Sequence, residues 1–79
     1  MTPKQFIGDK AVYDKFGQKI WAIDKKGVQQ MLCDLRGWGA IQNLFKLKDG
    51  SLDGNKADTF QDELGQFIAD AINEKLNKL

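Results

Sequence analysis

Residues able to do covalent chemistry are few in this chain, and they lack the partners that such chemistry needs. The 79 residues include one cysteine, Cys33, one serine, Ser51, and no histidine. A nucleophilic triad requires a base beside the nucleophile, and histidine is the usual base. We therefore expect Cys33 to be a small buried apolar residue with a free thiol. No catalytic residue is predicted, and the protein is expected not to be an enzyme.

The acidic residues near the C-terminus also have a structural explanation. They occupy polar positions of a segment with helical periodicity: Asp62, Glu63, Asp70 and Glu74. Solvated charge on an amphipathic helix accounts for them, so their spacing implies no cleft for acid–base catalysis.

One loop imitates the first half of a calcium-binding loop. Asp49, Ser51 and Asp53 fall at ligand positions 1, 3 and 5, and Gly54 falls at the turn position. The match fails at position 12, which needs a bidentate acid and holds Phe60. We expect a polar connector that binds no calcium. Without histidine and with one cysteine, the chain has no zinc-ligand cluster, so neither a metal nor a cofactor is predicted.

The tetrapeptide at residues 36–39 is the most distinctive motif. Arg36 and Trp38 could stack on a base, a sugar or a partner's side chain. The flanking Gly37 and Gly39 would allow a ligand to approach the backbone closely. Alternatively, the glycines only form a bend and Trp38 fills the core.

A C-terminal helix over residues 58–78 is the clearest predicted element. Asp58 and Gln61 have the spacing of a capping box at its start, and Glu74 and Lys78 form an i,i+4 pair near its end. Apolar residues recur there at steps of three and four, as one face of a helix requires: Phe60, Leu64, Phe67, Ile68, Ala71, Ile72, Leu76 and Leu79.

Upstream, short β-prone runs predict strands near 11–14, 19–24 and 28–35. The connecting segments at 14–17 and 24–27 are D-x-x-G turns, which suits a three-stranded meander.

The third run is ambiguous, because Val28, Met31, Leu32 and Leu35 also fit a helical period. The glycines that follow favour a strand, then a bend and a helix over 38–46. Thr2 and Pro3 suggest a short N-terminal helix. The predicted fold is a small α+β domain over residues 1–79: a three-stranded antiparallel meander packed against two C-terminal helices.

Both faces of this sheet are partly apolar. In the second strand, Trp21 and Ile23 point to one face, and Ile20 and Ala22 point to the other. In the third strand the expected grouping is Met31, Cys33 and Leu35 against Val28 and Leu32. Two helices cover one face, so the other face needs another molecule or an N-terminal segment containing Phe6 and Ile7. The candidate interaction surface is Trp21, Ile23, Arg36 and Trp38.

A chain this short buries only about 60% of its unfolded surface, and it has no disulfide to compensate. A partner chain remains as compensation, so the sequence predicts a protein-interaction or accessory module (an adaptor, inhibitor or subunit) that self-associates, most simply as a homodimer. The absence of a signal peptide or a long apolar run predicts a cytoplasmic protein that does not engage a membrane.

Charge leaves a second hypothesis open. Residues 1–48 hold nine basic and four acidic side chains, whereas residues 49–79 hold three and seven. The alternative function is therefore a nucleic-acid-binding accessory protein. Its contacts would be the basic residues of the first half: Lys10, Lys15, Lys19, Lys25, Lys26 and Arg36.

Overall fold

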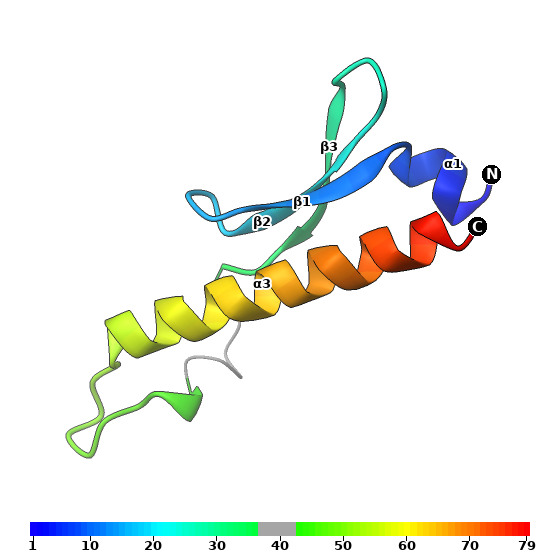
Figure 1. The fold of residues 1–79 in the computed structure, drawn as a ribbon. Coiled ribbons are helices and arrows are strands. Elements are labelled where there is room, and N and C mark those ends of the chain that lie inside the picture. The colour runs from blue at the N-terminus through cyan, green and yellow to red at the C-terminus, as the bar shows by residue number, and fades with distance from the viewer. Residues whose placement is uncertain (37–42) are drawn as a thin grey trace.

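The fold is an antiparallel sheet with one long helix across it. The structure, a computed structural model, describes residues 1–36 and 43–79. Strands β1 (Lys10–Asp14), β2 (Lys19–Ile23) and β3 (Gln29–Asp34) form a meander in the order β1-β2-β3. A short helix, α1 (Pro3–Ile7), precedes the sheet, and α3 (Gly54–Asn77) packs against it (Figure 1). The predicted α+β class, with its three-stranded meander and short N-terminal helix, is confirmed.

Aspartate side chains form both turns of the meander. In the first turn, Asp14 Oδ1 accepts a hydrogen bond from the Phe16 amide at 3.0 Å. In the second, Asp24 Oδ1 accepts from the amides of Lys26 and Val28, at 2.8 and 3.0 Å. Gly27 follows with a φ of 82°, a left-handed conformation that glycine adopts without strain. These carboxylates are therefore used to shape the turns.

The third apolar run is a strand and not a helix, and it contains an irregularity that the sequence did not reveal. Ile20 pairs with Cys33 while Trp21 pairs with Met31, so a β-bulge places Leu32 between the two pairs. Side-chain alternation therefore shifts within β3.

Two predicted helix boundaries are wrong. The long helix begins at Gly54, four residues before the predicted cap, because the side chain of Asp53 accepts from the Lys56 amide at 3.2 Å and caps it there. The helix predicted over 38–46 lies mostly outside the described residues. Of its described residues, Asn43 and Leu44 are helical, as predicted. Phe45 and Lys46 are not, because the Phe45 carbonyl accepts from the Asp53 amide and Lys46 bridges to Leu52.

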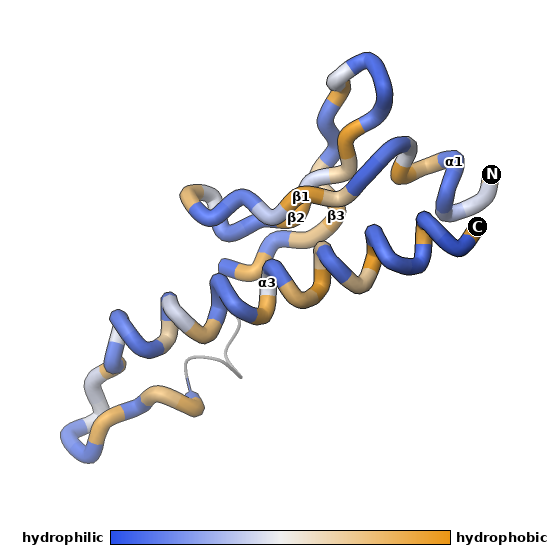
Figure 2. Tube along the Cα trace, viewed as in Figure 1, coloured by the Kyte–Doolittle hydropathy of each residue, from blue (hydrophilic) through white to orange (hydrophobic). Residues whose placement is uncertain are grey.

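The core lies where α3 crosses the sheet, and it is small. Ala11, Ile20 and Ala69 are its buried centre, and apolar residues gather at this crossing (Figure 2). Within residues 1–36 and 43–79, only two large side chains, Ile20 and Leu35, are fully buried. The helix approaches closely at Gly65, where an added Cβ would lie 2.7 Å from Tyr13 Cζ and closer still to other atoms of the ring.

Two polar contacts fix α3 on β1. The Tyr13 hydroxyl donates to Asp62 Oδ1 at 2.6 Å. Partial burial and this hydrogen bond raise the pKa of Tyr13 above its usual range. The Asn73 amide accepts from the Ala11 N–H at 2.7 Å and donates to the Ala11 carbonyl at 2.8 Å, as a neighbouring strand would.

The chain is extended and exposes much surface for its mass. Its radius of gyration is 14.8 Å, whereas a compact chain of this length would have about 12 Å. It exposes 5801 Å², which is about 1,000 Å² more than a folded monomer of 8.9 kDa is expected to expose.

Candidate interaction surface

The face of the sheet opposite α3 carries an apolar patch centred on Trp21. Val12 and Met31 pair with Trp21 across β1 and β3, and directly paired residues share a face. Ile23 lies two residues along β2 on the same side. We call Val12, Trp21, Ile23 and Met31 the outer sheet face.

No described element covers this outer sheet face (Figure 1). Val12, Trp21 and Ile23 are half-buried by their strand neighbours, and Met31 is 51% exposed. A hollow of about 470 Å³ lies along Val12, Trp21 and Ile23. The patch is therefore open to a partner.

Charges surround the outer sheet face. Lys10 and Lys19 pair with Ile23 and Asp14 across the β1–β2 ladder, so both lysines lie on this face. The Lys19 ammonium lies 6.0 Å from the Trp21 ring centroid, within reach of a cation–π interaction. An apolar centre with a polar rim is the usual anatomy of a protein-interaction surface.

The predicted grouping of Met31, Cys33 and Leu35 on one face is wrong because of the β-bulge. Cys33 pairs with Ile20 and packs against the core, and Leu35 is fully buried. Met31 belongs to the outer sheet face with Trp21. Sequence alternation alone cannot locate a bulge, so Met31 was not a predicted member of the surface. Val12 was not predicted either, because its place beside Trp21 depends on the register between β1 and β2.

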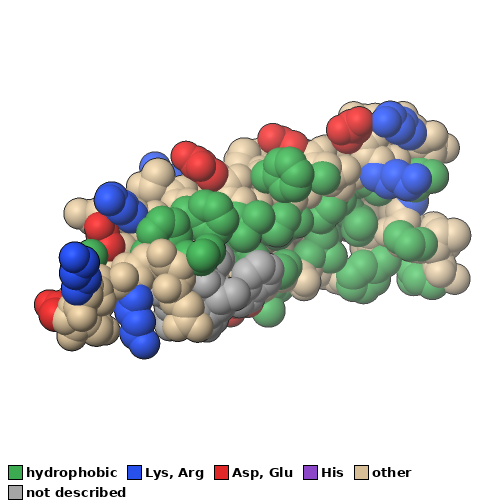
Figure 3. Space-filling model, turned by 90° about the horizontal axis from the view of Figure 1, so that it is seen from below, with side chains coloured by type: hydrophobic (Ala, Val, Ile, Leu, Met, Phe, Trp, Pro, Cys, Tyr) green, Lys and Arg blue, Asp and Glu red, His purple; other side chains and the backbone are tan. Residues whose placement is uncertain are grey.

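The N-terminal segment does not lie over the outer sheet face. Phe6 is 50% exposed, and Ile7 lines an apolar groove against the C-terminal half of α3, together with Phe67 and Leu79. Seen from below, apolar side chains form a band along α3 with acidic residues on its border (Figure 3). Phe67, 70% exposed, makes α3 a second apolar surface.

The other two predicted surface residues are not brought to Trp21 by the described structure. Arg36 is exposed and binds the Asp34 carboxylate with two nitrogens, Nε–Oδ1 at 3.0 Å and Nη2–Oδ2 at 2.8 Å. These contacts lower the pKa of Asp34 to about 2. Trp38 lies outside the described residues.

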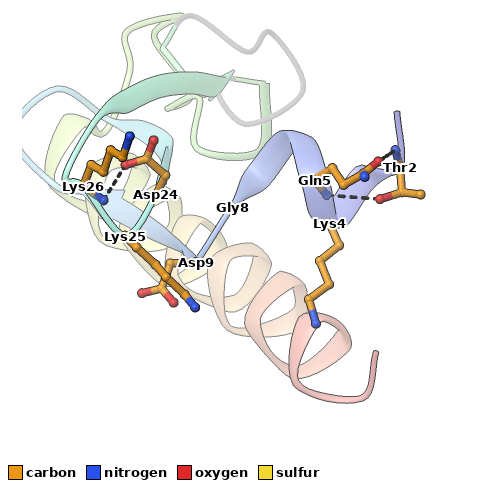
Figure 4. Close-up of a pocket in the computed structure, with 8 residues that line it drawn as sticks. All are labelled: Thr2, Lys4, Gln5, Gly8, Asp9, Asp24, Lys25 and Lys26. Atoms are coloured by element: carbon orange, nitrogen blue, oxygen red, sulfur yellow. Dashed lines mark hydrogen bonds between the residues drawn. The ribbon is translucent and has the colours of Figure 1, made fainter.

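Part of the polar lining of a hollow beside α1 is engaged in the protein's own hydrogen bonds. About 570 Å³ lies between α1 and the β2–β3 turn, and Figure 4 shows its lining residues. Thr2 and Gln5 cap α1 with each other, at 3.1 and 2.8 Å, and Asp24 holds the turn. Lys4, Lys25 and Lys26 line this hollow as well.

The predicted chemical residues are not assembled into a site within the described part of the chain. Ser51 donates its hydroxyl to Asp49 Oδ1 at 2.5 Å, and its amide bonds the same oxygen at 2.9 Å, so this carboxylate organises its own loop. Among residues 1–36 and 43–79, no three or more side chains of His, Cys, Asp or Glu are grouped to hold a metal ion. Within the same ranges, no helix combines the length and apolar character needed to cross a bilayer.

The basic residues of the first half are spread over the sheet. Lys15 lies in the β1–β2 turn, whereas Lys25 and Lys26 lie in the β2–β3 turn at the other end of β2. Lys10 and Lys19 stand between them with Asp14 on the same face.

Comparison with known proteins identifies no relative: no family model, curated protein or solved structure matches this chain.

Proposed function

We propose that this chain is a non-catalytic protein-interaction module that self-associates through its outer sheet face. The observation that carries the proposal is Trp21 with three apolar neighbours on a face that no described element covers. Burying that face in a second copy would enlarge a core in which the described part of the chain places only two fully buried large side chains.

The exposed area supports the same function. The excess of about 1,000 Å² is close to the roughly 800 Å² per partner that a standard protein–protein interface buries. Tryptophan is among the residues most enriched at the energetic centre of interfaces. Two-fold packing of the sheets would place the two Trp21 side chains near its centre.

The wider setting proposed is a reducing, cytoplasmic one with a protein as the partner. The free thiol of Cys33, half-buried against the core, fits such a compartment. Nucleic-acid binding is the weaker alternative, because the lysines are dispersed and Arg36 is engaged by Asp34.

Sedimentation equilibrium tests the proposal. The wild-type protein should show a mass of at least two copies at tens of micromolar, where one chain is 8.9 kDa. Trp21→Lys should reduce the mass while retaining the helical circular dichroism of α3. Leu47→Lys is the matched control, since Leu47 is 50% exposed and belongs to the segment before α3, which lies away from the sheet (Figure 1). A mass near 8.9 kDa at every wild-type concentration would refute self-association. Dissociation by Phe67→Lys but not by Trp21→Lys would move the interface to α3.

A further inference from the structure

The two edge strands of the sheet differ in whether their outward backbone groups are hydrogen-bonded by another part of the chain. At the β1 edge, the Asn73 amide satisfies both backbone groups of Ala11, at 2.7 and 2.8 Å. At the β3 edge, no described residue plays the same role for Gln29 or Met31. An uncovered strand edge is a template for pairing with another chain.

The register identifies which groups of β3 point outward. The Asp24 amide donates to the Val28 carbonyl at 3.1 Å, so this pair is hydrogen-bonded. Hydrogen-bonded and non-bonded pairs alternate along an antiparallel ladder. Gln30, opposite Ala22, therefore directs its backbone groups to β2, whereas Gln29 and Met31 direct theirs to the free edge.

These outward groups are complementary to themselves. A two-fold axis at Gln30 sets Gln29 of one copy opposite Met31 of the other, and the reverse. Both residues of each pair point their N–H and C=O toward the partner, so four backbone hydrogen bonds form. The side chains impose no like-charge contact there, because residues 29–31 are Gln, Gln and Met.

We propose that a second copy of this chain adds to β3 in antiparallel orientation about a two-fold axis at Gln30. The sheet then has six strands in the order β1-β2-β3-β3-β2-β1. This inference deepens the proposed self-association, on which it rests, by naming a contact distinct from the outer sheet face. The two outer sheet faces become adjacent on one side of the extended sheet. Where the two-fold axis of the face contact crosses the axis at Gln30 at a right angle, both contacts together close in a tetramer.

An engineered disulfide between the two copies tests whether the two-fold axis passes through Gln30. Gln30 residues facing each other across the axis form a non-hydrogen-bonded pair, with Cα atoms about 4.5 Å apart, within disulfide reach. Gln29 is offset from its own counterpart by two residues, about 7 Å along the strand, which is beyond that reach. In a Cys33→Ala background, Gln30→Cys should oxidise to a cross-linked dimer at least about tenfold faster than Gln29→Cys.

Lys26→Cys, in the exposed β2–β3 turn, measures the rate of random collision. Equal rates for Gln30→Cys, Gln29→Cys and Lys26→Cys would overturn the proposal. Cross-linking of Gln30→Cys at the predicted advantage supports it.

Charge exchange provides a second measurement that does not depend on oxidation. Gln30→Lys and Gln30→Asp each place like charges across the axis and should lose the edge contact, whereas their equimolar mixture should restore it. A mixture that sediments no heavier than either variant alone would overturn the proposal.

The failures of the two proposals are distinguishable. If Trp21→Lys leaves the mass unchanged while Gln30→Cys still cross-links, the outer sheet face is wrong and the edge contact stands. If Trp21→Lys reduces the mass but Gln30→Cys shows no advantage, the face stands and the edge contact is wrong.

Discussion

Gly65 tests how closely α3 lies on the sheet. In an exposed helix interior, Gly→Ala stabilises by about 1 kcal/mol. At Gly65 a methyl group would overlap the Tyr13 ring, so either α3 or the ring must shift. Overpacking of this kind costs about 1–3 kcal/mol, and displacing Tyr13 from Asp62 removes a hydrogen bond to a charged group worth about 1.5–3 kcal/mol.

We therefore expect Gly65→Ala to reduce the free energy of unfolding by about 2 kcal/mol, after allowing for the helix propensity it gains. For a domain of this size that lowers the Tm by about 10 °C. Urea denaturation followed by circular dichroism measures the change. Gly54→Ala, at the start of α3 with no atom within 4 Å of an added Cβ, is the control and should not destabilise.

A double-mutant cycle identifies the cause. In a Tyr13→Leu background the ring is absent, so Gly65→Ala should stabilise by up to about 1 kcal/mol. Two results would refute the close approach of α3 to Tyr13. One is that Gly65→Ala stabilises the wild-type protein. The other is that Gly65→Ala changes the free energy of unfolding equally in the wild-type and Tyr13→Leu proteins.

Two further predictions concern titrating groups. Because the pKa of Tyr13 is raised, the stability it contributes is complete below its unfolded pKa of about 10 and is lost as the pH rises beyond that. Tyr13 is the only tyrosine, so tyrosinate absorbance should appear together with alkaline unfolding, and Tyr13→Phe should flatten this pH dependence; ionisation well before unfolding would contradict it. Arg36→Gln should raise the pKa of Asp34 from about 2 toward 3.8 in an NMR titration. The stability from the lowered pKa is present above about pH 4 and is lost as the pH falls toward 2, so the variant should lack that acid dependence. Lys19→Gln makes the same change in charge but should move this pKa less, and an equal shift would contradict the assignment to Arg36.

The sequence predicted the meander because its turns have local chemistry. Asp14 and Asp24 cap turns with their own side chains, an interaction spanning two to four residues. Alternation in β2 also separated Trp21 and Ile23 from Ile20 and Ala22, which fixed half of the outer sheet face. Such features need no knowledge of distant residues.

The predictions were wrong or incomplete where contacts between distant residues, or an irregularity in a strand, determine the structure. The start of α3 depended on which of several aspartates is free to cap it, and Asp53 does so rather than Asp58. The bulge at Leu32 moved Met31 away from Cys33, and alternation has no signal for it. The contact between Asn73 and Ala11 was not predicted, because the two residues are 62 positions apart and no local signal distinguishes Asn73 from other polar residues of the helix.

That separation has a kinetic consequence. The contacts fixing α3 on β1 join residues 49 and 62 positions apart, so the first strand remains without its covering helix until nearly all of the described chain is present. Contacts between residues so far apart form late, because the cost of closing the loop must be met before the contacts stabilise the chain. During that interval Ala11 and Ile20 lack the helix that buries them, and the meander carries two open edges instead of one. When α3 packs on the sheet, Asn73 hydrogen-bonds both backbone groups of Ala11 at the β1 edge. The helix therefore prevents a strand of another chain from pairing with β1 there, but only late in folding.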